Sequence, residues 1–138
     1  MRRVLPLAAA VCLAAACDAA SSVAGCTESL AFVSIQVLDT IGAPSTQVTA
    51  SHHVPRTGRT LTVPQDGALT AQGRYVVLTD IQRGEILPAG DTVRMSGIQG
   101  TTAFVADFLL DVPDGCHVRK VAGPDTVRLQ STGQRLRR

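Results

Sequence analysis

Alternation of apolar and polar residues is the main pattern in this chain of 138 residues. It is clearest over residues 30–38, where the apolar positions include Val33, Ile35 and Val37. Because successive side chains of a strand point to opposite faces, this segment predicts a strand with one buried and one exposed face. Similar segments rich in valine and threonine follow at residues 46–51, 59–63, 73–80 and 91–98.

Turn-forming residues separate these segments. Pro-Gln-Asp-Gly at residues 64–67 predicts a turn, and residues 81–90, with two glycines and a proline, predict a long loop. After a hairpin turn at 97–100, residues 101–112 alternate again, and shorter strands follow to about residue 130. About seven short strands without a helical period predict an all-β, immunoglobulin- or transthyretin-like sandwich, with a closed barrel as the alternative.

The first residues read as an export signal. Arg2 and Arg3 precede an apolar run that begins at Val4 and ends in Ala-Ala-Ala-Cys17. A bilayer-spanning helix needs about 20 apolar residues, so this shorter run predicts a cleaved signal over residues 1–16. We therefore expect a tether at 17–26, a single domain at 27–130 and a basic disordered tail at 131–138.

The end of this signal is similar to the bacterial lipobox, in which a cysteine after small residues becomes the lipidated first residue. The resemblance implies lipidation of Cys17, although the segment Val-Ala-Gly-Cys26 offers a second match. We favour Cys17 because the apolar run that positions the peptidase substrate stops there. The protein is then expected in the cell envelope, held to the membrane by lipid and facing the periplasm or the cell surface.

The remaining cysteines predict one disulfide. If Cys12 leaves with the signal and Cys17 carries lipid, Cys26 and Cys116 remain as a pair in an oxidising compartment. Such a bridge would close most of the mature chain into one loop, worth about 4 kcal/mol in the chain-entropy model. The alternative is that both are buried, unpaired thiols.

Charge argues against nucleic acid as a partner. The chain has 13 lysines and arginines and 11 acidic residues, so removal of Arg2 and Arg3 leaves a net charge of zero. Three of the remaining basic residues lie in the last four positions, which makes the body slightly acidic. A surface without excess positive charge lacks the electrostatic attraction on which phosphate-backbone binding depends.

One motif resembles a known family. Asp39-x-x-Gly42-x-Pro44, with a later Gly73-x-Tyr75 segment, is similar to the carboxypeptidase regulatory-like domain, a transthyretin-like sandwich. The resemblance implies that the motif forms the first hairpin turn, in which glycine takes a positive φ and proline starts the next strand. Such domains act as accessory or scaffold modules, so the resemblance implies no catalytic residue and no cofactor.

The residues that could act in catalysis or bind a metal are not spaced in the sequence as a shared site requires. His52 and His53 are neighbours on a predicted strand and point to opposite faces, which disfavours a shared metal site. The same argument separates His117 from Cys116 and predicts a surface histidine. Residues 107 and 111 are aspartates on the outward parity of one strand, expected to be solvated rather than a coupled acid pair. We therefore predict a protein that is not an enzyme and holds no metal.

A contact function remains. The loop at 81–90 is the candidate contact element because binding residues concentrate on loops held by rigid scaffolds; its residues of interest are Arg83, Glu85, Ile86 and Leu87. Packing of its apolar residues onto the core is the alternative. The main hypothesis is docking on another envelope protein. A small-ligand or carbohydrate-binding module is second, because the chain has no tryptophan and one tyrosine to stack on a sugar.

Overall fold

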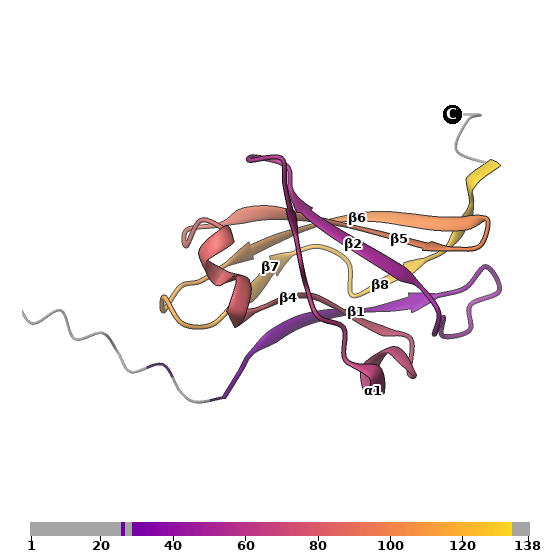
Figure 1. Cartoon of the computed structure of the whole chain (residues 1–138), viewed down its shortest axis with the longest axis horizontal. Coiled ribbons are helices and arrows are strands. Elements are labelled where there is room, and N and C mark those ends of the chain that lie inside the picture. The colour runs from indigo at the N-terminus through magenta and orange to yellow at the C-terminus, as the bar shows by residue number, and fades with distance from the viewer. Residues whose placement is uncertain (1–25, 27–28, 134–138) are drawn as a thin grey trace, which may run out of the picture.

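The computed structural model describes residue 26 and residues 29–133, which form two stacked β-sheets with very little helix (Figure 1). The prediction of an all-β sandwich is confirmed. The described part of the chain contains nine strands, against about seven predicted. The predicted last strand is divided between the two sheets, which adds to the number.

The small sheet has three strands in the order β4-β1-β8. Strand β1 (Phe32–Leu38) pairs antiparallel with β4 (Arg74–Thr79) and parallel with β8 (Thr126–Arg128). The alternation predicted for β1 is confirmed, because its inward side chains, Val33 and Ile35 among them, are buried. The outward side chains of this sheet form the floor of the groove described below.

The large sheet has six strands, with β3-β2-β5-β6-β7 in order and β9 also paired with β6. Its strands are β2 (Thr49–Val54), β3 (Arg59–Leu61), β5 (Asp91–Gln99), β6 (Thr102–Asp111), β7 (Arg119–Ala122) and β9 (Gln130–Ser131). The long hairpin of β5 and β6 is its centre, in register from Asp91↔Leu110 to Gln99↔Thr102. The chain passes from β7 to β8 in the small sheet and returns to β9.

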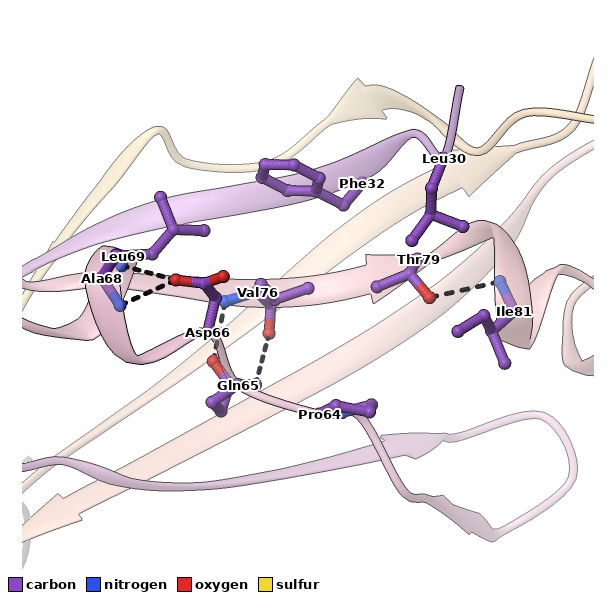
Figure 2. A pocket seen from close by; sticks show the side chains of 10 residues that line it. All are labelled: Leu30, Phe32, Pro64, Gln65, Asp66, Ala68, Leu69, Val76, Thr79 and Ile81. Atoms are coloured by element: carbon purple, nitrogen blue, oxygen red, sulfur yellow. Dashed lines mark hydrogen bonds between the residues drawn. The ribbon is translucent and has the colours of Figure 1, made fainter. Parts of the chain in front are cut away.

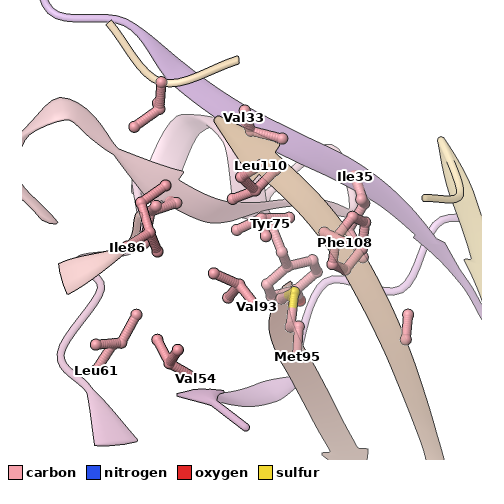
Figure 3. Close-up of a cluster of buried hydrophobic side chains, with 14 of the residues drawn as sticks. Val33, Ile35, Val54, Leu61, Tyr75, Ile86, Val93, Met95, Phe108 and Leu110 are labelled. Carbon is pink, nitrogen blue, oxygen red and sulfur yellow. The ribbon is translucent and has the colours of Figure 1, made fainter. Parts of the chain in front are cut away.

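The core lies between the two sheets (Figure 3). Tyr75, Phe108 and Met95 are among its largest fully buried side chains. The tyrosine hydroxyl accepts a hydrogen bond from Val48 N (2.9 Å) and donates one to Ser45 O (3.1 Å). A buried hydroxyl needs such partners, so Tyr75 fixes the segment that crosses from β1 to β2 as well as filling the core.

Two short helical turns flank β4. Helix α1 (Gly67–Thr70) begins after Asp66, whose Oδ1 accepts hydrogen bonds from the first backbone N–H groups of the turn. The 3-10 helix η1 (Asp80–Glu85) begins after Thr79 with a capping box. The sequence predicted a turn at 64–67 and an unstructured loop at 81–90. Half of the predicted loop is helical, because the Thr79 side chain caps the first turn of η1. Gly84 and Pro88 favoured the prediction of a loop, so the capping signal at Thr79 was overlooked.

The Asp39–Pro44 motif forms a turn, as predicted. Asp39 Oδ1 accepts hydrogen bonds from three successive backbone N–H groups at 2.8–2.9 Å, and Gly42 has φ +97°. Leu38 and Pro44 form an isolated antiparallel bridge. The hairpin that the resemblance implied is wrong, however, because the chain crosses after the turn to β2 in the large sheet, and β2 begins at Thr49 rather than at Pro44.

Several predicted boundaries differ from the structure. Strand β2 begins at Thr49 rather than 46, and β7 begins at Arg119 rather than 116. Ser131, placed by prediction in the tail, belongs to β9, and Thr132 N donates to Thr101 O. In the described residues, helices are all too short and polar to span a bilayer.

Candidate functional site

An open groove of about 580 Å³ lies on the outer face of the small sheet (Figure 2). Strand β4 forms its floor, the first residues of β1 form one wall, and the segment between β3 and α1 forms the other. Its volume is within the range of small-ligand sites. The residues that line it are Leu30, Phe32, Pro64, Gln65, Asp66, Ala68, Leu69, Val76, Thr79 and Ile81.

The second wall is fastened to the free edge of β4 by one side chain. The Gln65 amide donates from Nε2 to Val76 O (3.0 Å) and accepts from Val76 N at Oε1 (2.8 Å). His52 Nε2 also lies 3.0 Å from Val76 O. Because a carbonyl oxygen can only accept a hydrogen bond, Nε2 is the donor. Gln65 thus takes the place of a neighbouring strand, which protects an edge that would otherwise pair with other chains.

The groove presents an apolar surface. Its exposed side chains include Leu30 (55%), Phe32 (47%) and Ile81 (69%). The Gln65 amide is engaged by Val76, and the Thr79 hydroxyl lies 2.7 Å from the side chain of Gln82. Polar groups that are already paired gain little from a new ligand, so the groove suits an apolar occupant.

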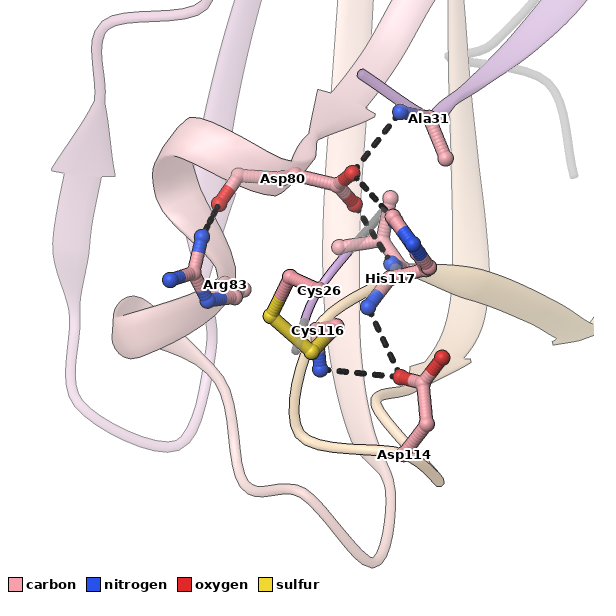
Figure 4. The surroundings of a disulfide bond; sticks show 8 residues. Cys26, Ala31, Asp80, Arg83, Asp114, Cys116 and His117 are labelled. Carbon is pink, nitrogen blue, oxygen red and sulfur yellow. Dashed lines mark hydrogen bonds and ion pairs between the residues drawn. A yellow bond between two sulfur atoms is a disulfide. The ribbon is translucent and has the colours of Figure 1, made fainter. Parts of the chain in front are cut away.

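A buried carboxylate lies at the Ile81 end of the groove (Figure 4). Asp80 Oδ2 accepts hydrogen bonds from Ala31 N (2.7 Å) and from His117 Nδ1 (2.8 Å). Its Oδ1 accepts one from Val118 N (2.7 Å). One side chain therefore joins three segments that are distant in sequence: the start of β1, the start of η1 and the approach to β7.

The pKa of Asp80 reflects two opposing effects. Burial alone would raise it, because it disfavours the charged form. Hydrogen bonds from His117, Val118 N and Ala31 N outweigh burial and hold the pKa of the Asp80 carboxyl below its ordinary value. The carboxylate is thus charged at neutral pH.

A disulfide lies beside this cluster. Cys26 and Cys116 are joined, with Cα atoms 5.3 Å apart, which confirms the predicted pairing. Asp114 Oδ1 accepts from Cys116 N and His117 N, each at 2.8 Å, and so shapes the turn that presents the cysteine. The N-terminal segment is thereby attached to the fold at the same end of the small sheet as Asp80.

His117 is not the surface histidine that the sequence predicted. Its side chain is 26% exposed, and its Nδ1 lies 2.8 Å from the Asp80 carboxylate. The prediction failed because a contact between residues 37 positions apart leaves no local pattern. A histidine on a carboxylate could orient a base for a nucleophile, but the neighbouring cysteine is already bonded to Cys26.

The predicted contact loop is only partly available for contact. Ile86 is 4% exposed and belongs to the core, so its prediction as a contact residue was wrong and the alternative of core packing holds. Glu85 forms an ion pair with Arg59, and Arg83 Nη1 donates to Asp80 O (3.0 Å). Leu87 remains 45% exposed.

The two neighbouring histidines diverge, as predicted. His52 is 3% exposed, and burial lowers its pKa despite its hydrogen bond to Val76 O, while His53 is half-buried on the other face. Among the residues that the structure describes, acidic, histidine and cysteine side chains form no cluster that could hold a metal.

The outer face of the large sheet carries a second apolar surface. Ile98 (57%), Val105 (42%) and Leu109 (39%) are exposed there, and we call them the large-sheet patch. Ile98 and Val105 are diagonal neighbours, because Ile98 pairs with Ala103, two residues before Val105 on β6. The patch lies on the opposite side of the sandwich from the groove.

An ion pair borders Ile98 and Val105 and separates them from Leu109. Arg94 donates to both carboxylate oxygens of Asp107 at 2.6 and 2.7 Å, which lowers the pKa of Asp107. Asp107 is exposed, as predicted, but Asp111 is not: it is 8% exposed and bound by Arg119. The residue opposite Asp111 on β7 is Arg119, and its guanidinium donates hydrogen bonds to both oxygens of the carboxylate that the sequence placed in solvent.

The sequence interpretation missed the residues that build the groove and its polar end, namely Leu30, Gln65, Asp80 and Ile81. One signal was available: Asp80 follows directly on the apolar strand β4, and a carboxylate at the end of a buried strand needs partners. Gln65 gave no signal, because its role is to bond the backbone of Val76.

Comparison of the chain with protein-family models, with curated proteins and with solved structures found no match. Cys17, the residue for which lipidation was predicted, lies outside the described residues.

Proposed function

We propose that this chain is a non-enzymatic lipoprotein of the cell envelope that docks on another envelope protein. The predicted signal and tether support export and anchoring, and the sandwich supports an accessory or scaffold module of the carboxypeptidase regulatory-like kind. The large-sheet patch is the observation on which docking depends. Contiguous exposed apolar side chains are typical of protein contact sites, whereas single ones are common on any surface.

The shape and composition of the large-sheet patch suit a protein partner. Ile98 and Val105 form an apolar centre, and Arg94 and Asp107 provide a polar margin. Apolar centres with a polar margin are typical of protein interfaces. The β5–β6 hairpin that carries the patch is the longest in the described fold, so the surface is held rigidly.

The alternative of a carbohydrate-binding module has less support. A sugar needs several convergent hydrogen-bonding groups and an aromatic ring, and the groove offers paired polar groups and one phenylalanine. The large-sheet patch contains no aromatic residue.

The disulfide bears on the choice of the lipidated residue. A sulfur atom bonded to Cys116 cannot also carry a lipid thioether, so Cys26 is disfavoured and we propose Cys17. We expect Cys17→Ser to lose membrane fractionation. Cys26→Ser and Cys116→Ser should both keep it, and loss in Cys26→Ser alone would move the lipid to Cys26.

Docking is tested by a photo-crosslinking amino acid placed at Val105 in cells. We expect one reproducible protein adduct that disappears when Ile98→Arg is added. The matched control is Gln36, which lies on the outer face of the small sheet and should give no such adduct. An adduct that is equally strong from both positions, or unaffected by Ile98→Arg, would contradict docking at the large-sheet patch.

A further inference from the structure

The chain enters the fold at one end of the groove. Leu30 lines the groove, and the next residue, Ala31, is bound to Asp80 by its backbone N–H. Asp80 also precedes Ile81, the lining residue at that end. The disulfide attaches Cys26 to Cys116, and the next residue, His117, contacts Asp80. The N-terminal segment is therefore held, at Cys26, at the same end of the groove as Ile81.

The disulfide also limits how far this end can lie from the membrane. With lipid at Cys17, eight residues lie between the anchor and Cys26, which makes nine residue steps. A chain spans at most about 3.6 Å per step, so Cys26 stays within about 30 Å of the bilayer surface. Without the bridge, the free segment would extend to Ala31 and the limit would be about 50 Å.

The surface at this end is apolar. Leu30, Phe32 and Ile81 are exposed and come from different parts of the chain: the lead-in to β1, the strand itself and η1. Exposed Leu and Phe side chains beside a membrane anchor are typical of surfaces that enter the boundary between headgroups and acyl chains.

The charges of the same face suit anionic headgroups. The strand side chains on the outer face of the small sheet include two exposed arginines and no carboxylate; they are Phe32, Ser34, Gln36, Leu38, Arg74, Val76, Thr79, Thr126 and Arg128. Asp66, at the margin of the groove, uses Oδ1 to cap α1. In contrast, Arg94 on the large-sheet patch is neutralised by Asp107.

From these observations we infer that the groove face of the small sheet is a membrane-contacting surface. Leu30, Phe32 and Ile81 enter the interface, and Arg74 and Arg128 lie against anionic lipid headgroups. The orientation rests on the proposed lipid anchor. It directs the large-sheet patch away from the bilayer, where a protein partner can reach it.

The absence of tryptophan from the sequence allows a site-specific test. Phe32→Trp places a single fluorophore in the groove, and Ile98→Trp is the matched control on the opposite face. The full chain, purified from bacterial envelopes, is mixed with excess phosphatidylglycerol–phosphatidylcholine vesicles whose acyl chains are brominated. Mass spectrometry of the N-terminal peptide of the same sample reports separately whether Cys17 carries lipid.

We expect the bromine atoms to quench the fluorescence of Phe32→Trp by about half, because side chains at the interface lie about 5–10 Å deep, and to leave Ile98→Trp unquenched. Adding Ile81→Ser, or replacing the anionic lipid by a neutral one, should weaken the quenching. Selective quenching without lipid on Cys17 supports the membrane surface and contradicts the anchor.

No quenching of Phe32→Trp, with or without lipid on Cys17, overturns the membrane surface, and a lipidated sample would in that case leave the anchor intact. Equal quenching of Phe32→Trp and Ile98→Trp also overturns the membrane surface, because the two faces of the sandwich would then contact the bilayer equally. A photo-crosslinker at Phe32 that captures a protein while the tryptophan stays unquenched would assign the groove to a protein partner instead.

Discussion

Asp80→Asn tests the polar cluster that joins three segments of the fold. The carboxylate accepts hydrogen bonds from Ala31 N, His117 Nδ1 and Val118 N. An asparagine keeps one acceptor oxygen but turns an N–H donor toward at least one of these donors. Hydrogen bonds to a charged group contribute about 1.5–3 kcal/mol each, and a buried donor without a partner adds its desolvation cost. We expect a loss of about 3 kcal/mol in the free energy of unfolding at pH 7.

The stabilising effect of Asp80 depends on pH. The pKa of Asp80 is lower in the folded than in the unfolded protein, so its stabilising effect is complete above the ordinary carboxyl pKa. The effect decreases as the pH falls toward the folded-state pKa, where the carboxylate becomes protonated. The difference between the wild type and Asp80→Asn should therefore be largest near neutral pH and should shrink in acid.

Urea unfolding followed by circular dichroism, with the disulfide intact, measures both effects. Asp107→Asn is the control, because it removes an exposed ion pair and should cost no more than about 1 kcal/mol. If Asp80→Asn costs less than the control, or if the cost of Asp80→Asn is unchanged in acid, the account of the cluster is wrong.

Three further predictions concern the body of the domain. Tyr75→Phe should lower the free energy of unfolding by about 1–3 kcal/mol, because a buried backbone donor and acceptor lose the hydroxyl. Replacement of both Cys26 and Cys116 by serine should cost about 4 kcal/mol, measured by urea unfolding against the oxidised wild type. Gly97→Ala should cost about 1–3 kcal/mol, because its Cβ would lie 2.2 Å from Phe104, whereas Gly84→Ala meets no atom within 4 Å.

A specific result would contradict each of these three predictions. An unchanged unfolding midpoint in Tyr75→Phe would mean that water replaces the hydroxyl. Reducing agent that destabilises the double serine variant as much as the wild type would show that the bridge is not the cause. Equal stability of the two glycine variants would contradict close packing at Gly97.

Strand alternation was readable from the sequence where one face of a strand packs on the core and the other faces solvent. The inward residues of β1, β5 and β6 follow the predicted period, because the sheets bury one face of each. The period did not predict the burial of Asp111 at the end of β6, where Arg119 on β7 binds the carboxylate. Such a contact depends on which residue of another strand lies opposite, and the local sequence does not contain that information.

The contact surfaces were less predictable than the fold. The loop at 81–90 was chosen for its apolar residues, but Ile86 fills the core, whereas Ile81 and Leu87 are exposed. The Asp80–His117 pair and the Gln65 bridge depend on side chains meeting across the fold. Only the cysteine pairing could be inferred at long range, because the expected signal and lipid anchor accounted for two of the four cysteines and left Cys26 and Cys116.

The parallel pairing of the first strand with β8 has a consequence for the timing of folding. Gln36 pairs with Thr126, so the small sheet is incomplete until nearly the whole chain has been made. Contacts between residues so far apart in the sequence form late, and proteins that depend on them fold slowly. A chain that emerges from a ribosome with its first hundred residues can form the β5 half of the central hairpin, but β1 then still has an open edge. If the chain is exported as proposed, a translocase that requires an unfolded chain would therefore meet an incomplete sheet rather than a finished domain.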